Sequence, residues 1–121
     1  MSRVIHFEIP ADNPERAVKF YKDVFGWQIA KWEGPMEYWL ATTGADGPGI
    51  NGGLMRRQFP GQGTVNTLGV LSVDDALAKI QQSGGKLAMP KMAIPGIGWL
   101  AYCQDPEGNT FGIMQADAGA K

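Results

Sequence analysis

The chain has one histidine, His6, and a carboxylate, Glu8, follows two residues later. Side chains two residues apart in a β-strand share one face, and the sequence Val-Ile-His-Phe-Glu-Ile alternates as such a strand does. An imidazole and a carboxylate on one face would form an acid–base pair if an apolar cavity raised the carboxyl pKa. They would also supply two ligands to a metal ion. Taken alone, however, a single strand histidine is more often a hydrogen-bonded core or pocket residue than a metal ligand.

Other catalytic motifs in the sequence are incomplete. Cys103 is the only cysteine and could pair with His6, but no third residue that would orient such a pair is indicated. The glycine-rich segments 47–49 and 61–63 lack the Lys-Ser/Thr and the helix that a phosphate-binding loop requires. No catalytic residue is therefore assigned, and whether the protein is an enzyme stays open.

Composition limits the class of protein. The chain has 121 residues, is 44% hydrophobic and 19% charged, and is typical of one globular domain. A net charge of −1 without a basic block predicts no nucleic-acid partner. No apolar run approaches the roughly 20 residues of a membrane span, and the start of the chain lacks a secretory h-region, so no membrane partner is expected. With a single cysteine, these features predict a cytoplasmic location.

The first half reads as strand, helix and three strands. Residues 3–9 form the first strand, in which Ile5, Phe7 and Ile9 face away from His6 and Glu8. The helix begins near residue 13, either with Asn13 as cap and Pro14 in its first position or with Asp12 and Glu15 as a capping box, and it ends at Gly26. Three strands follow at 27–33, 37–43 and 50–57. Gly52-Gly53 in the last strand indicates a bulge or a close approach of backbone.

The second half repeats this order. A strand at 65–71 leads to a helix capped near Ser72 and stopped by Gly84-Gly85. A short strand at 86–89, a loop or irregular strand at 90–98 and a hairpin of 99–104 with 110–115 complete it, and the tail 116–121 is expected to fray. Each half therefore has the order β-α-β-β-β.

Two motifs carry a family resemblance. Asp105-Pro106-Glu107-Gly108-Asn109 followed by an apolar strand resembles the closing hairpin of the vicinal oxygen chelate superfamily, and Phe20-Tyr21 to Phe25-Gly26 resembles the end of its first helix. This superfamily holds glyoxalase I, extradiol dioxygenases, fosfomycin-resistance enzymes and bleomycin-binding proteins. The resemblance covers roughly residues 4–115. It implies an α+β fold in which two tandem βαβββ modules form a curved sheet around a cavity, with the helices on the convex side.

The resemblance also implies boundaries and an assembly. Residues 1–121 form a single domain, with module one at about 3–58, a linker at about 59–64 and module two at about 65–116. Phe111 and Ile113 then face the second helix, whereas Thr110, Gly112 and Met114 face the cavity. Family members commonly complete their cavities through dimers, so a homodimer is expected.

Enzymes of this family hold one divalent metal with His and Glu ligands, and the resemblance places His6 at the first ligand position. The last-strand Glu would fall at Gly112 and the fifth-strand ligand near Leu68, while residues 47–73 contain no Asp, Glu, His or Cys. The scaffold is therefore expected without its metal centre, and no metal and no cofactor are predicted. The remaining alternative is a new site in which Glu8, Glu33 or Glu37 joins His6.

The leading interpretation is a metal-free relative of the bleomycin-binding proteins that binds a small apolar or aromatic molecule in its cavity. Tryptophan, tyrosine and methionine residues on the expected strands suit such a cavity. The alternatives are a metal-dependent enzyme of lyase or dioxygenase type with a non-standard site, and a ligand-free dimeric interaction module. The candidate ligand-binding residues are His6, Glu8, Trp39, Trp99, Tyr102 and Met114.

Overall fold

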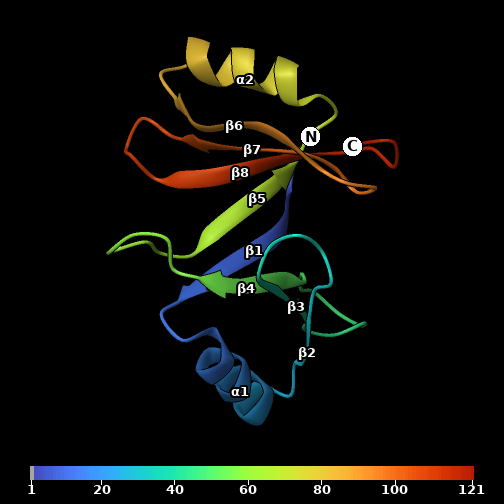
Figure 1. The fold of residues 1–121 in the computed structure, drawn as a ribbon. Coiled ribbons are helices and arrows are strands. Elements are labelled where there is room, and N and C mark those ends of the chain that lie inside the picture. Colours follow the sequence, from blue (N-terminus) through green and yellow to red (C-terminus); the bar gives the residue numbers. More distant parts are fainter. Residues whose placement is uncertain (1) are drawn as a thin grey trace. The chain divides into compact units, whose positions relative to one another are not determined.

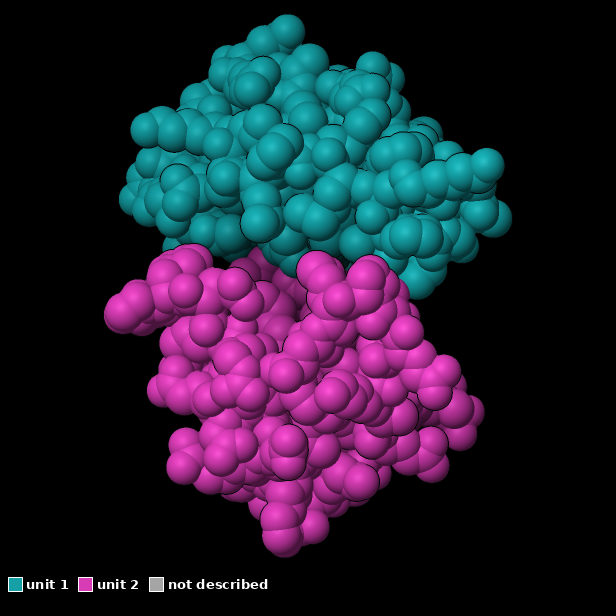
Figure 2. All heavy atoms as spheres, in the orientation of Figure 1, with its two compact units in different colours: residues 1–5, 66–121 teal, residues 6–65 magenta. Residues whose placement is uncertain are grey.

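The computed structural model describes residues 2–121 and divides them into two compact units (Figure 2). Unit 2 is His6–Val65 and holds most of the first expected module, and unit 1 is Asn66–Lys121 together with residues 2–5. The start of the chain belongs to unit 1 because the Arg3 carbonyl accepts a hydrogen bond of 2.9 Å from the Gly69 amide. The α+β fold with two βαβββ modules is as predicted.

Unit 2 is a four-stranded sheet with one helix (Figure 1). The strand order is β2-β3-β4-β1, with β1 and β4 parallel and the other pairs antiparallel. Its elements are β1 (Val4–Ala11), α1 (Pro14–Phe25), β2 (Gln28–Lys31), β3 (Tyr38–Thr42) and β4 (Gly52–Arg56). Of the two starts that the sequence left open for helix α1, the structure has the Asn13 cap, whose side chain accepts from the Arg16 amide. The helix ends as predicted at Gly26, which has a φ of 71°.

The core of unit 2 lies between α1 and one face of this sheet. Trp39, Ala41 and Leu54 are buried there, and Ile9 packs against them. Phe7 contacts Trp27 on the same side, with ring centroids 5.6 Å apart. Because strand side chains alternate, His6 and Glu8 lie on the opposite, helix-free face of the sheet, as predicted.

Unit 1 has the same plan. The strand order is β5-β8-β7-β6, with β5 and β8 parallel. Its elements are β5 (Val65–Gly69), α2 (Val73–Gln82), β6 (Lys86–Ile94), β7 (Gly98–Gln104) and β8 (Thr110–Ala116). Val73, Ala101, Cys103 and Ile113 form its core against α2, and Phe111 packs beside them. The predicted direction of Phe111 and Ile113, toward the second helix, is confirmed.

The turn between β7 and β8 is the one that the sequence predicts. The Asp105 carboxylate accepts from the amides of Glu107 and Asn109, at 2.9 Å each, and from the Asn109 side chain. Gly108 has a φ of 85°, which an L-residue rarely adopts. Hydrogen bonds from Asn109 hold the pKa of the Asp105 carboxyl below its usual value.

The sequence left residues 90–98 open as a loop or an irregular strand, and it predicted a frayed tail. Strand β6 continues past residue 89 to Ile94 as an irregular strand, because register shifts on either side of Met89 accommodate Pro90 in a strand that still pairs with β7. The expectation for the tail is wrong. The carbonyl of Ala120, a residue only 3% exposed, accepts from the Gly96 amide, and the Asp117 carboxylate accepts from the Trp99 indole at 3.0 Å.

No helix within residues 2–121 is both long and apolar enough to cross a membrane.

Candidate functional site

The helix-free face of unit 2 is organised around Gly53. Gly53 lies beside Glu8 on β1 and beside Leu40 on β3. The next side chain of β3 on this face is Tyr38, because Trp39 between them is in the core. A Cβ built on Gly53 would lie 2.1 Å from the Tyr38 hydroxyl oxygen. The glycine therefore leaves the space in which the phenol of Tyr38 crosses β4 and reaches β1. The group that approaches Gly53 is a side chain, whereas the sequence indicated a bulge or a close approach of backbone.

Tyr38 joins the two candidate residues of the first strand. Its hydroxyl lies 2.7 Å from His6 Nε2 and donates a hydrogen bond of 3.0 Å to Glu8 Oε2. A phenol has one proton, so while Tyr38 donates to the carboxylate it accepts from the Nε2–H of His6. This arrangement assigns the Nε2-protonated tautomer to the imidazole. We call His6, Tyr38 and Glu8 the polar triad.

Burial shapes the charge of the polar triad. Glu8 is 6% exposed, which is unusual for a carboxylate. Desolvation lowers the pKa of His6 below its ordinary value, and the nearby Glu8 charge opposes this only in part. The imidazole is therefore neutral at neutral pH, which agrees with a single Nε2–H donor to the phenol. Beside this neutral imidazole, the Glu8 carboxylate accepts a hydrogen bond from the phenol.

An aromatic surface continues from the polar triad along unit 2. The His6 and Tyr38 rings are nearly parallel, at 16° and 6.3 Å between centroids, and Trp32 meets Tyr38 edge-on at 79°. The Trp32 amide donates to the Tyr38 carbonyl at 2.7 Å, which places both side chains on the same face. Gly34 lies directly against the Trp32 ring. A Cβ built on Gly34 would lie 2.1 Å from Cζ2 of that ring. These contacts fix the indole, so it offers a rigid aromatic surface beside two hydrogen-bonding groups.

The helix-free face of unit 1 holds Tyr102 and Met114, as the sequence predicts. Tyr102 pairs with Gly112, and Gly112 pairs with Thr67, so the three share one face of β7, β8 and β5. Thr67 is 3% exposed, and its hydroxyl oxygen lies 2.7 Å from where a Gly112 Cβ would sit. The residue beside Gly112 on β5, expected near Leu68, is Thr67. Leu68 itself pairs with the core residue Ile113 and faces α2.

Trp39 and Trp99 lie on the other side of their sheets from the expected cavity. Trp39 is 8% exposed in the core beneath α1. Trp99 packs against the core beneath α2 and donates its indole N–H to Asp117. We correct both placements and leave these tryptophans out of the candidate site. The physical reason is that β3 and β7 carry aromatic side chains on both faces, so hydrophobicity alone does not reveal which residue points toward the helix.

Tyr38 and Trp32 belong to the site but are absent from the candidate residues of the sequence analysis. The position of Tyr38 in β3 explains its omission. It immediately precedes Trp39, and the choice between them depended on the phase of β3. One signal was available, because a side chain large enough to need the space above Gly53 must come from a neighbouring strand. The triad therefore contains two predicted residues, His6 and Glu8, and one that only the register identifies.

The donor set does not fit the divalent metal that the family resemblance implies. Within residues 2–121, no three His, Cys, Asp or Glu side chains come close enough together to hold a metal ion. His6 Nε2 and Glu8 Oε2 both contact the Tyr38 hydroxyl, and Glu37 pairs with Arg56 at 3.0 Å. A catalytic zinc site uses about three protein ligands. The chemistry that this face supports is hydrogen bonding, aromatic stacking and proton transfer.

Solved structures with the same fold come from several bacteria. A hypothetical protein of Bacillus halodurans C-125 has a TM-score of 0.73 and 14% identity, covering 99% of this chain and 98% of that one. A Streptomyces coelicolor methylmalonyl-CoA epimerase variant in complex with 2-nitronate-propionyl-CoA has a TM-score of 0.71 and 16% identity, covering 98% and 97%. At these identities, the likeness shows the fold alone.

Sequence comparison gives the family. A "Glyoxylase-like domain-containing protein" of Didymella fabae is 30% identical over 119 residues, which cover 88% of this chain and 88% of that protein. The sequence profile of the Glyoxalase/Bleomycin resistance protein/Dioxygenase superfamily matches residues 3–113. The chain belongs to the Glyoxalase/Bleomycin resistance protein/Dioxygenase superfamily.

Proposed function

We propose that this protein binds a small aromatic or apolar molecule, without a metal ion, at the polar triad and Trp32 on the helix-free face of unit 2. One observation carries the proposal. The Tyr38 phenol lies over Gly53 and contacts both His6 Nε2 and Glu8 Oε2, the atoms that would otherwise be offered to a metal. The family scaffold is thus used with a hydrogen-bonded cluster in place of a metal centre.

The chemistry of this face defines the ligand class. Trp32 and the Tyr38 ring supply aromatic surface that suits a flat or apolar body. The hydroxyl of Tyr38 and the neutral imidazole of His6 supply polar partners for one hydroxyl, amide or carbonyl group. The buried Glu8 carboxylate disfavours an anionic group at this position, because two unscreened like charges repel strongly. A neutral aromatic molecule with one hydrogen-bonding group fits these conditions.

A fluorescence titration tests this proposal. Neutral phenols and aromatic amides are added to the protein, and tryptophan emission is followed in the wild type and in Trp32→Phe. Ligand-dependent quenching should be largely lost in Trp32→Phe, since that indole lines the proposed site. Tyr38→Phe should weaken binding by about 1 kcal/mol, the typical value of one hydrogen bond. Tyr21→Phe, which alters an aromatic on the α1 side, serves as the matched control.

Elemental analysis tests the metal-free part separately. After mild purification, the protein is expected to carry no stoichiometric divalent metal, and added zinc, nickel or iron should produce no glyoxalase I or ring-cleaving dioxygenase activity. The reason is the shortage of ligands around His6. One equivalent of bound metal that His6→Ala abolishes would overturn the metal-free assignment.

Proton transfer at carbon is a second candidate, favoured by one observation. A buried carboxylate, Glu8, is linked through a phenol to a neutral imidazole, and such a chain can accept and return a proton. Two of the fold neighbours are described as methylmalonyl-CoA epimerases. Racemisation of methylmalonyl-CoA in deuterated water, with deuterium entering the product, would support this candidate. Glu8→Gln should then abolish exchange, whereas a wild type without exchange excludes this substrate.

We also propose that the chain forms a homodimer. Strand β6 ends the strand order of unit 1 and exposes Leu87 and Met89, which are 41% and 49% exposed. An edge strand with exposed apolar side chains is a site for association. Sedimentation at micromolar concentration is expected to show a dimer, and a monomer would contradict the proposal.

A further inference from the structure

A second site candidate lies in unit 2, on the side of α1. A groove of about 480 Å³ runs between the end of β1 and the start of α1. Its lining includes Ile9, Ala17 and Tyr21, which pack on the helix-facing core and not on the helix-free face. The groove is therefore separate from the polar triad. Its volume is in the range of small-molecule sites, roughly 300–1,000 Å³.

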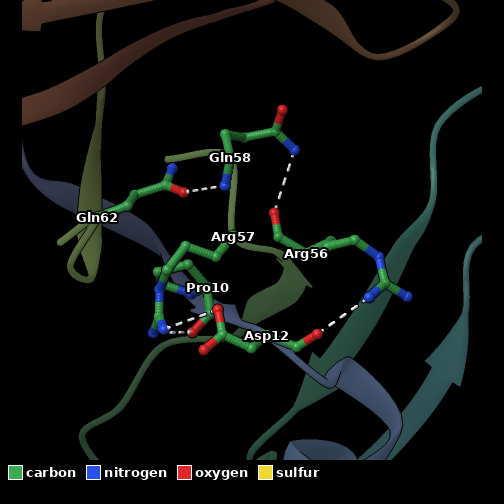
Figure 3. Close-up of polar contacts among 6 residues, drawn as sticks. All are labelled: Pro10, Asp12, Arg56, Arg57, Gln58 and Gln62. Atoms are coloured by element: carbon green, nitrogen blue, oxygen red, sulfur yellow. Dashed lines mark hydrogen bonds and ion pairs between the residues drawn. The ribbon is translucent and has the colours of Figure 1, made fainter. Parts of the chain in front are cut away.

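One end of this groove is cationic. The Arg57 guanidinium donates from Nη2 to the Pro10 carbonyl and from Nη1 to Asp12 Oδ1, both at 3.2 Å (Figure 3). Its Nε atom is buried and has no acceptor within the part of the chain that the structure describes. Arg16 also lines the groove, and its exposed guanidinium has no hydrogen bond or ion pair among residues 2–121. Two arginines, Arg16 and Arg57, and one acidic residue, Asp12, thus line the groove.

The rest of the groove is apolar. Phe20 lies in its wall with 51% of its surface exposed, and it meets Tyr21 edge-on with centroids 5.2 Å apart. Ile9 and Ala17 add aliphatic surface. An exposed aromatic next to an unpaired guanidinium recognises molecules that carry an anion at one end and an aromatic body at the other. A carboxylate is the simplest such anion, since a guanidinium binds it through two parallel N–H groups.

We propose that this groove binds a small aromatic carboxylate, with its anion between Arg16 and Arg57 and its ring against Phe20. Asp12 occupies one Arg57 donor in the free protein, and its side chain is 75% exposed, so it can turn away when the ligand arrives. The site has the opposite charge preference from the polar triad, where the buried Glu8 disfavours anions. The two proposals are therefore independent and fail separately.

A matched pair of probes tests this inference. 2-Naphthoate and the neutral 2-naphthylmethanol are titrated into ¹⁵N-labelled protein, and amide shifts give both affinity and location. 2-Naphthoate should bind more tightly, with shifts centred on Arg16, Ala17 and Phe20, and added salt should weaken it. Equal affinity for the two probes would overturn the proposal, as would shifts confined to Tyr38 and Gly53.

Two charge variants should move the affinity in opposite directions. Arg16→Gln removes an exposed cation and should weaken 2-naphthoate binding about threefold, the size expected for a partly exposed charge pair. Asp12→Asn removes the competing carboxylate while keeping an acceptor for Arg57, and should strengthen binding by a similar factor. Arg3→Gln, which changes a cation of unit 1, is the control and should have no effect. The same response in all three variants would show a general charge effect and would overturn the site.

Discussion

The hydroxyl oxygen of Tyr38 lies 2.1 Å from the point that a Cβ on Gly53 would occupy. Real Cβ atoms do not come so close to another heavy atom, so Gly53→Ala must displace the phenol and break its contacts with His6 and Glu8. We expect a loss of about 1–3 kcal/mol in the free energy of unfolding, as for other overpacked sites, together with loss of ligand binding at the triad. Urea denaturation measures the first quantity and fluorescence titration the second.

Gly44→Ala is the matched control for this steric argument. A Cβ on Gly44 would meet nothing within 4 Å, and Gly44 does not have a positive φ. The free energy of unfolding should then change by less than about 0.5 kcal/mol. Equal effects of the two substitutions would mean that the cost comes from the backbone and not from Tyr38.

Tyr38→Phe removes the phenol oxygen while keeping the ring. Glu8, which is buried, then loses a donor, and His6 Nε2 loses its partner. A hydrogen bond to a charged group typically contributes about 1.5–3 kcal/mol, so this variant should unfold at a lower urea concentration. Tyr21→Phe should stay within about 0.5 kcal/mol of the wild type, as substitutions outside such networks do. A Tyr38→Phe protein as stable as the wild type would contradict the bridging role.

The polar triad also predicts how stability depends on pH. Burial lowers the pKa of His6 below its ordinary 6.5, so the unfolded chain binds the proton more readily than the folded one. The stabilisation is complete above pH 6.5 and is lost as the pH falls below it, toward the lower pKa of the folded state. His6→Gln keeps an N–H donor but does not titrate, so its unfolding free energy should fall less steeply with acidity. Parallel pH profiles for the two proteins would contradict this account.

Sequence periodicity predicted the fold well because most elements carry strong local signals. Asn13 and Gly26 define α1, Asp105 and Gly108 define the β7–β8 turn, and alternation in β1 sets His6 apart from Ile9. Local signals of this kind predicted only half of the candidate site. Whether Tyr38 or Trp39 faces the helix depends on the register with β4, and that pairing is a long-range contact that no local pattern specifies.

The faces of β3 can be tested by comparing two tryptophans. Trp39 is buried beneath α1, so Trp39→Ala should cost about 3–5 kcal/mol of folding free energy, as other large core deletions do. Trp32 lies on the helix-free face and is only partly buried, so Trp32→Ala should cost clearly less while removing the proposed ligand surface. Urea unfolding ranks the two variants. The reverse order would mean that the phase of β3 is wrong.

Gly112 and Thr67 form the corresponding tight contact in unit 1. A Cβ on Gly112 would lie 2.7 Å from the Thr67 hydroxyl oxygen and 3.4 Å from its Cβ and Cγ2. Because Thr67 is 3% exposed, its side chain cannot turn into solvent to make room. Gly112→Ala alone should therefore destabilise the protein by about 1–3 kcal/mol. The family's last-strand carboxylate, expected at this position, would meet the same obstacle.

A double-mutant cycle isolates this contact. Thr67→Ala removes the hydroxyl and methyl groups that obstruct the new Cβ, so the double variant Thr67→Ala with Gly112→Ala should be more stable than the sum of the single effects predicts. Side chains in contact typically show coupling of about 0.5–3 kcal/mol, whereas distant pairs add within about 0.5 kcal/mol. Pairing Gly112→Ala with Gly44→Ala of unit 2 gives the additive reference. Additive behaviour of the Thr67 pair would show that Gly112 is not required by this contact, and the absence of a carboxylate there would then need another physical cause.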